Sequence, residues 1–299
     1  AGEGSVDNDV FFNSIAKAWD SNSNEIDWNK WAESAFDGMR PMFELEQEPN
    51  MPAAHIAMLT GARGPTRSCL TACAASTQAI GEAAMLVRNG LADIMITGGA
   101  HSMLHPLGLT GFNRLTALST RNDSPQTASR PFSATRDGFI LGEGAAILII
   151  ESLKSAKKRG AKILAEISGY GSTADAFRVT DMHEQGRGAQ LAIKAALKDA
   201  AVTIDDIDYI STHGTSTAEN DSIETKAVKG VFADRAKDVP LSSIKSVMGH
   251  LIGATGAAET ISCVLAIREN IIPPTMNLND PDPELDLDYV PNEPRKAKL

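Results

Sequence analysis

Short apolar runs alternate along the chain with longer stretches rich in alanine and glycine. The first run, residues 67–71, predicts a strand, and the small-residue stretch from Ala74 predicts a helix that ends at Asn89 and Gly90. A second apolar strand is predicted over residues 92–99. Strand, helix and strand at this spacing predict a right-handed crossover in a buried parallel sheet.

Later runs continue the same alternation. Strands are predicted over residues 145–150, 165–171 and 207–212, and helices over residues 152–159 and 189–200. The pattern is typical of an α/β protein.

The second half of the chain repeats the first in outline. A predicted strand over residues 242–245 leads into a small-residue helix near Gly253, as the first strand leads into the helix after Cys73. This weak repeat predicts two βα halves that face each other across a shared core. Before the first half, Trp28 and Trp31 are spaced to lie on one helix face, where packing is the simplest role.

Composition narrows the class of protein. The 299 residues are 42% hydrophobic and carry a formal net charge of −10, which argues against non-specific binding to nucleic acid. No apolar run approaches the ~20 residues of a membrane span, and the first residues do not resemble a signal peptide. Cys69, Cys73 and Cys263 show no metal-ligand spacing, so we expect no metal site, no disulfide framework and a cytoplasmic location.

Cys73 lies where the predicted strand passes into the helix. Its sulfur should therefore lie beside unpaired N–H groups at the positive end of the helix dipole. We expect this to lower the thiol pKa from its usual ~8.5 and to favour the nucleophilic thiolate. A cysteine in isolation is more often structural, and the polar clusters elsewhere decide between the two roles.

Three polar clusters stand out beside Cys73, and the first two of them follow predicted strands. His213 stands in the first, Lys245 and His250 in the second, and Glu224 in the third. Side chains beyond strand ends converge on one crevice in a parallel α/β sheet. A buried lysine needs a carboxylate partner, and Glu224 is the candidate partner for Lys245. The alternative is that Cys73, His213, His250 and Lys245 are four unrelated structural polar residues.

One cysteine, two histidines and one lysine fit acyl transfer. The thiolate of Cys73 would attack an acyl thioester and hold the acyl group covalently. The imidazoles of His213 and His250 could donate hydrogen bonds to an oxygen on which negative charge develops. Neither step needs a metal ion.

Three motifs carry a family resemblance. Residues 71–76 (Thr-Ala-Cys-Ala-Ala-Ser), 212–217 (Thr-His-Gly-Thr-Ser-Thr) and 245–251 (Lys-Ser-Val-Met-Gly-His-Leu) resemble the signature motifs of β-ketoacyl-acyl-carrier-protein synthases, and the elongating ketoacyl synthase II type is the most similar. Further matching segments are residues 130–132, 136–139, 142–145 and 272–277.

The resemblance implies a thiolase-like fold. Its five layers, αβαβα, would come from two duplicated halves, residues 1–155 with the nucleophile and residues 161–299 with the histidines and lysine. By the family pattern, the first half lacks its N-terminal strand and the second lacks the final Gly-rich segment. The family also implies a homodimer.

The resemblance also implies a reaction. Cys73 would take an acyl chain from acyl carrier protein or coenzyme A, and malonyl-acyl carrier protein would then bind. His213 and His250 would hold the malonyl thioester carbonyl while carbon dioxide leaves, and the enolate would attack acyl-Cys73 to give a 3-oxoacyl product. Lys245, paired with Glu224, would organise the histidines.

The family pattern assigns further residues to the substrate. Thr215 and Thr217 would hydrogen-bond the phosphopantetheine arm, and Phe112 resembles an acyl-pocket residue. The enzyme would need no cofactor of its own, because phosphopantetheine is carried by the acyl carrier protein. His101, where the family usually has an acidic residue, and the acidic stretch 42–48 favour a specialised polyketide or lipid pathway.

Related classes fit less well. A non-catalytic subunit that sets chain length in a synthase heterodimer typically has Gln in place of the nucleophile, and this chain has Cys73. A thiolase needs a second catalytic cysteine, whereas Cys263 lies in a predicted helix. An initiating synthase has Asn where His250 stands.

Overall fold

The computed structural model describes residues 7–178 and 181–299, which fall into two compact units. The smaller unit ends at Leu70, and the larger one runs from Thr71 to Leu299. All residues of the predicted site belong to the larger unit. The predicted halves, residues 1–155 and 161–299, stay a prediction.

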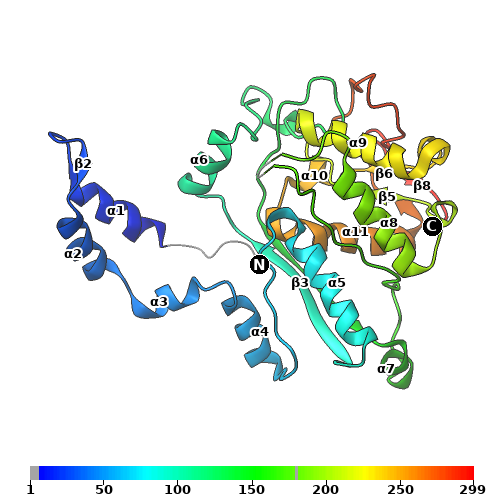
Figure 1. Cartoon of the computed structure of the whole chain (residues 1–299), viewed down its shortest axis with the longest axis horizontal. Coiled ribbons are helices and arrows are strands. Elements are labelled where there is room, and N and C mark those ends of the chain that lie inside the picture. Colours follow the sequence, from blue (N-terminus) through cyan, green and yellow to red (C-terminus); the bar gives the residue numbers. More distant parts are fainter. Residues whose placement is uncertain (1–6, 179–180) are drawn as a thin grey trace. The chain divides into compact units, whose positions relative to one another are not determined.

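The smaller unit is mostly helical. Its elements are α1 (Asn8–Ala18), β1 (Trp19–Asp20), β2 (Glu25–Ile26), α2 (Trp28–Gly38), α3 (Pro41–Glu46) and α4 (Met51–Thr60). The antiparallel pair β1–β2 turns the chain so that α1 and α2 pack against each other (Figure 1). Asp7 and Asp27 cap the two helices by accepting hydrogen bonds from backbone N–H groups of their first turns.

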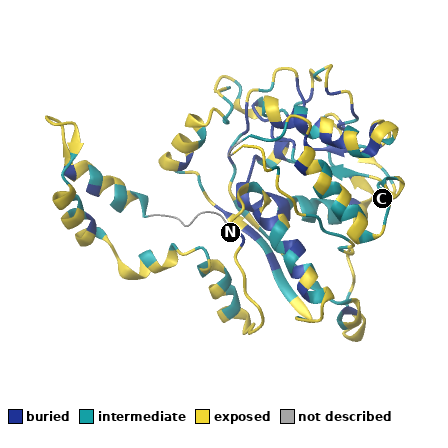
Figure 2. Cartoon of the chain, viewed as in Figure 1, coloured by how far each residue is buried: buried dark blue, intermediate teal, exposed yellow. Residues whose placement is uncertain are grey.

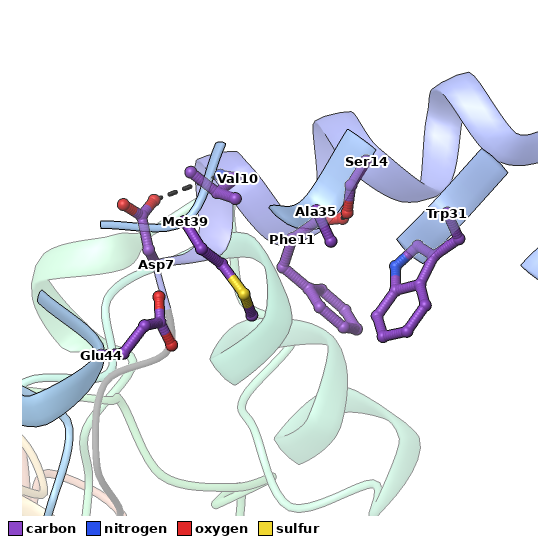
Figure 3. Close-up of a pocket in the computed structure, with 8 residues that line it drawn as sticks. All are labelled: Asp7, Val10, Phe11, Ser14, Trp31, Ala35, Met39 and Glu44. Atoms are coloured by element: carbon purple, nitrogen blue, oxygen red, sulfur yellow. Dashed lines mark hydrogen bonds between the residues drawn. The ribbon is translucent and has the colours of Figure 1, made fainter. Parts of the chain in front are cut away.

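The two tryptophans of α2 pack as the spacing predicted. The rings of Trp28 and Trp31 meet edge to face, with centroids 6.0 Å apart. Trp31 also lines a pocket of the helical unit, shown in Figure 3. The other residues that line it are Asp7, Val10, Phe11, Ser14, Ala35, Met39 and Glu44.

The larger unit begins with a turn and a helix. Its helices are α5 (Ala75–Arg88), α6 (Pro106–Arg114), α7 (Leu153–Lys158), α8 (Arg187–Ala200), α9 (Ala218–Phe232), α10 (Lys245–Met248) and α11 (Thr255–Glu269). Its 3₁₀ turns are η1 (Ala72–Ala74), η2 (Pro125–Thr127), η3 (Ile204–Asp206), η4 (Ala233–Lys237) and η5 (Ile252–Ala254). In the described part of the chain every helix is too short or too polar to cross a membrane.

The strands of this unit pair two by two. The long pair is β3 (Ile94–His101) with β4 (Gly144–Glu151), which run antiparallel with Ile96 opposite Ile149. The short pairs are β5 (Ile210–Ser211) with β6 (Leu241–Ser242), parallel, and β7 (Ile271–Ile272) with β8 (Arg295–Lys296), antiparallel.

Several predicted elements are confirmed by this description. The strand over residues 145–150 is β4, the helix over 189–200 is α8, and the basic helix is α7, capped by the Ser152 hydroxyl. Of the strand over residues 207–212, only β5 is formed.

Three strand predictions are wrong. Residues 67–71 and 165–171 form no strand, and β3 pairs with an antiparallel neighbour instead of closing a parallel crossover. Most residues of 67–71 are exposed and none of 165–171 is buried, and the apolar run of β3 does not specify in which direction its partner strand runs.

Two helices cover the β3–β4 pair. α5 packs on β3 and on α11, and α11 packs on both strands (Figure 1). Their first turns are in close contact, because the Ser76 hydroxyl accepts a hydrogen bond of 2.9 Å from the N–H of Ala257. A Cβ added at Gly256 would lie 1.9 Å from Oγ1 of Thr77, so only glycine fits there.

The main hydrophobic core lies between α9 and the C-terminal segment. Phe132 stacks on Tyr289 with ring centroids 3.8 Å apart, and Val228, Phe232 and Leu241 complete its centre. Figure 2 shows the buried residues that follow one side of α9. Val228 and Phe232 belong to the second half of α9, so this core anchors that part of the helix.

Candidate active site

Cys73 lies in the turn η1, directly before α5. The preceding residue, Ala72, has a left-handed backbone with φ of 47°, which its small side chain tolerates better than a larger one would. The sharp turn leaves the Cys73 side chain half-buried. The predicted position of this cysteine at the beginning of a helix is therefore confirmed.

The structure brings Cys73, His213 and His250 together. The sulfur of Cys73 lies 3.0 Å from Nε2 of His250, although the two residues are 177 positions apart. The rings of the two histidines meet edge to face, with centroids 5.3 Å apart. One nitrogen of each ring and the sulfur all lie within 4.8 Å of one another.

The surroundings of His250 determine which ring nitrogen carries the hydrogen. Nδ1 accepts a hydrogen bond of 3.2 Å from the backbone N–H of Ile252 and lies 3.0 Å from the Thr255 hydroxyl. In a neutral ring the hydrogen is then on Nε2, the nitrogen that faces Cys73. His250 thus presents an N–H donor at the sulfur.

The backbone of His250 is held by hydrogen bonds to residues 140 and 142. Its N–H donates to the carbonyl of Ile140 at 2.7 Å, and its carbonyl accepts from the N–H of Gly142 at 3.0 Å. The ring of Phe139 meets the imidazole edge to face at 5.2 Å. These contacts leave the ring little freedom to turn.

Lys245 is buried and forms an ion pair with Glu259. Its ammonium lies 2.5 Å from the Glu259 carboxylate and also donates to the carbonyl of His213. The predicted pair between Lys245 and Glu224 is therefore wrong. Glu259 lies one turn into α11, in a stretch otherwise rich in small and apolar residues, and a carboxylate in that stretch was the available signal for it.

Glu224 instead holds the loop that carries His213. One carboxylate oxygen accepts from the N–H of His213 at 2.6 Å, and the other accepts from the N–H of Gly214 at 2.7 Å. The Lys245 ammonium donates a hydrogen bond to the carbonyl of the same histidine. The two charged residues thus fix one peptide segment from its donor and acceptor sides.

Burial determines the protonation of the site. It raises the pKa of the Cys73 thiol, and the opposing effect of the Lys245 ammonium is smaller. The predicted lowering of this pKa is wrong, because desolvation outweighs the Lys245 ammonium and the backbone hydrogen bond, which both favour the thiolate. Burial and Lys245 together lower the pKa of His250 to about 3 and that of His213 well below its ordinary value. Near pH 7 the site therefore contains a thiol and two neutral imidazoles.

Burial also affects Glu224. It raises the pKa of this carboxyl group to about 7, although the two N–H donors and Lys245 oppose the shift.

The two predicted threonines lie in the loop after His213. Their hydroxyl oxygens are 2.9 Å apart, and Thr217 also caps α9 by accepting from the N–H of Asn220. Thr215 is buried and Thr217 is half-buried. Their hydroxyls therefore already have partners within the loop.

Phe112 belongs to an apolar cluster beside the cysteine. Its ring, on α6, meets that of Phe139 edge to face at 5.4 Å, and Phe139 meets His250 in the same way. Leu141 and Ile252 are buried in the cluster, and Cys73 packs against it. This cluster lies where an acyl chain on the sulfur could be covered.

Comparison with known families decides the class. Residues 20–156 match the profile described as "Beta-ketoacyl synthase, N-terminal domain", and residues 164–279 match the one described as "Beta-ketoacyl synthase, C-terminal domain". The chain belongs to the β-ketoacyl synthase family. The predicted family resemblance is thereby confirmed.

Curated relatives of this synthase-family chain are 3-oxoacyl-[acyl-carrier-protein] synthases 2. The Synechocystis protein is 49% identical over 246 residues, which are 82% of this chain and 59% of that protein. The Coxiella burnetii protein is 43% identical over 277 residues, which are 90% of this chain and 67% of that protein. The chain thus spans roughly three fifths to two thirds of the length of these relatives.

Solved structures share the fold. A type II polyketide ketosynthase solved with its acyl-carrier protein, AntDE:AntF, is 35% identical with a TM-score of 0.90, over 100% of this chain and 71% of that one. The ishigamide ketosynthase/chain length factor is 32% identical with a TM-score of 0.86, over 100% and 69%. A Burkholderia phymatum β-ketoacyl synthase is 33% identical with a TM-score of 0.82, over 99% and 68%. The predicted thiolase-like α/β fold of the ketosynthases is confirmed.

Proposed function

We propose that this chain catalyses the decarboxylative Claisen condensation of an acyl thioester with malonyl-acyl carrier protein. The product would be a 3-oxoacyl-acyl carrier protein, in fatty acid or polyketide-type chain elongation. The observation that carries the proposal is the sulfur of Cys73 beside two imidazoles, 3.0 Å from Nε2 of His250. The names of the curated relatives support the same reaction.

In the first half-reaction the sulfur of Cys73 attacks the carbonyl carbon of the acyl thioester. A new bond forms between the acyl carbon and the Cys73 sulfur, the bond between the acyl carbon and the carrier sulfur breaks, and the thiol proton of Cys73 leaves with the departing carrier thiol. The cluster around Phe112 and Phe139 would cover the bound chain.

In the second half-reaction the malonyl thioester loses carbon dioxide. The electrons of the broken C–C bond move onto the thioester oxygen, where the N–H of His250 and the ring of His213 would stabilise the negative charge. The enolate carbon then attacks the acyl group on Cys73. The C–S bond breaks, and the released sulfur takes up a proton from solvent.

Lys245 and Glu224 are positioning residues in this scheme. Their contacts with the carbonyl and N–H groups of the His213 segment hold the imidazole in place. Thr215 and Thr217 would bind the phosphopantetheine arm by exchanging their mutual hydrogen bond for one to the substrate.

We propose acyl carrier protein as the partner, phosphopantetheine as a group carried by that partner only, and a cytoplasmic homodimer as the working form. Cys73 and Cys263 are free thiols, which supports a reducing compartment. The solved relative in complex with an acyl-carrier protein supports the choice of partner. Mass photometry of the purified chain tests the homodimer.

Intact-mass spectrometry with an acyl-acyl carrier protein tests the reaction. The unaltered chain should gain the mass of one acyl group, and Cys73→Ala should gain none. Cys263→Ser is the matched control, because this cysteine lies on α11 outside the cluster, and it should be acylated normally. An acyl adduct that persists in Cys73→Ala contradicts the proposal.

The alternative function is a non-catalytic partner that sets chain length. The observation in its favour is that the ishigamide relative is described as a ketosynthase/chain length factor. It predicts a folded chain that is neither acylated nor able to release carbon dioxide from malonyl-acyl carrier protein. Either activity excludes it.

A further inference from the structure

We propose that Cys73, His213 and His250 together bind one Zn²⁺ ion, which reversibly blocks the nucleophile. Within residues 7–178 and 181–299, these are the three Cys, His, Asp or Glu side chains whose ligating atoms lie within 4.8 Å of one another. One sulfur and two imidazole nitrogens form a donor set that zinc sites of proteins use. The proposal goes beyond the condensing reaction, because it concerns a ligand that is neither substrate nor product.

The distances suit a tetrahedral ion. Zinc–sulfur bonds of ~2.3 Å and zinc–nitrogen bonds of ~2.0–2.1 Å place neighbouring ligand atoms about 3.5 Å apart. The sulfur of Cys73 and Nε2 of His250 are 3.0 Å apart, and all three ligand atoms lie within 4.8 Å of each other. Small rotations of the Cys73 and His213 side chains would therefore close the site around one ion, while the His250 ring stays in place. With three protein ligands, the fourth position is left for water.

The donor set also selects the metal. Thiolate and imidazole are soft and borderline ligands that favour Zn²⁺ over Mg²⁺ or Ca²⁺, which prefer oxygen. Neither Glu224 nor Glu259 competes for the ion. The first is engaged by two backbone N–H groups and the second by Lys245.

Binding has a defined proton balance. The Cys73 thiol releases its proton to the buffer as the sulfur–zinc bond forms. The hydrogen on Nε2 of His250 moves to Nδ1, where the Thr255 hydroxyl, 3.0 Å away, can accept it. The N–H of Ile252 then loses its acceptor, and the Lys245 ammonium repels the ion. Both effects make the site weaker than a structural zinc site, and so reversible.

Zinc titration against a chromophoric chelator tests the site. The full chain, reduced with a phosphine, should bind one equivalent of Zn²⁺. Cys73→Ser and His250→Gln should each weaken binding by more than the ~10–100-fold that loss of an outer-shell partner causes. Cys263→Ser, the matched control on α11, should bind as the unaltered chain does. Circular dichroism establishes that each variant is folded.

Alkylation gives a second readout that does not depend on activity. Bound Zn²⁺ should protect Cys73 from iodoacetamide but leave Cys263 equally reactive, as measured by peptide mass spectrometry, and a chelator should restore the reaction of Cys73. Folded chain that binds no stoichiometric zinc, or that binds it equally well as Cys73→Ser, overturns the proposal.

The two proposals fail separately. The acyl-adduct experiment is run without added metal, so its failure leaves the zinc result intact. Normal acylation together with absent zinc binding would overturn only the zinc site. Under the zinc proposal, Thr255→Val should weaken zinc binding, because it removes the acceptor for the Nδ1 hydrogen.

Discussion

The ammonium group of Lys245 and the carboxylate of Glu259 form a buried ion pair with an N–O distance of 2.5 Å. The lysine side chain is 1% exposed, and its ammonium also donates to the carbonyl of His213. One cation therefore joins α11 to the loop that carries a site histidine. The pair therefore ties the position of the His213 backbone to that of α11.

Removal of the Glu259 carboxylate should destabilise the fold strongly. Glu259→Ala leaves the Lys245 ammonium buried without a counter-ion, and we expect the free energy of unfolding in urea to fall by ~3–5 kcal/mol. The matched control is Asp286→Ala, which breaks the exposed pairs with Lys229 and Lys237 and should cost at most ~1 kcal/mol. Equal losses in the two variants would contradict the interpretation of the buried pair.

The reactivity of Cys73 should report its raised pKa. The rate of alkylation by iodoacetamide, followed by peptide mass spectrometry across pH, should have its midpoint above the ~8.5 of a free cysteine. Lys245→Met should move the midpoint higher still, because the ammonium lowers this pKa. A midpoint near neutral pH would mean that the helix end outweighs desolvation.

Gly256→Ala should destabilise the contact between α5 and α11. The new Cβ would lie 1.9 Å from Oγ1 of Thr77 and 3.0 Å from its backbone nitrogen. We expect a loss of ~1–3 kcal/mol in the free energy of unfolding. Gly111→Ala is the helical control, since nothing lies within 4 Å of a Cβ there, and it should be neutral or slightly stabilising. Thr77→Ala in the Gly256→Ala background should recover part of the loss.

Arg136→Lys should loosen the loop that carries the two threonines. The guanidinium is almost fully buried and donates to the carbonyls of Thr217 (3.3 Å), Ala218 (3.0 Å) and Ser133 (2.8 Å) and to Asp282 (2.7 Å). The single ammonium group of a lysine cannot donate all of these hydrogen bonds in the planar geometry of the guanidinium.

For the proposed reaction, Arg136→Lys should raise KM for the carrier-bound substrate more than it lowers kcat. The alkylation rate of Cys73 should stay unchanged. Arg159→Lys, at the more exposed pair with Glu151, is the control and should alter neither constant. A fall in kcat alone would show that Arg136 does not act through substrate binding.

The sequence predicted much of the site because its chemistry is local. Cys73, His213 and His250 each belong to a short polar or small-residue motif beside a predicted strand, so their convergence could be expected from the end of a sheet. Glu259 was missed because no polar cluster surrounds it. Its role depends on the direction in which α11 points, which only tertiary packing determines.

The helices and caps were also predictable, since periodicity and residues such as Ser152 act within a few positions. The pairing of the strands could not be predicted in the same way. The partner of β3 is fixed by the fit of Gly98 and Gly99 against β4, Ser76 and η5, and a hydrophobic pattern contains no information about that fit. The pKa of Cys73 likewise depends on desolvation by residues distant in the sequence.

The contact of α5 with α11 limits how this protein can evolve. The Ser76 hydroxyl accepts a hydrogen bond from the N–H of Ala257, and Thr77 leaves no room for a side chain at Gly256. The surfaces of α5 and α11 are therefore complementary in shape. A substitution on one side is tolerated only with a compensating one on the other. Lineages that retain this geometry should therefore exchange residues here in pairs.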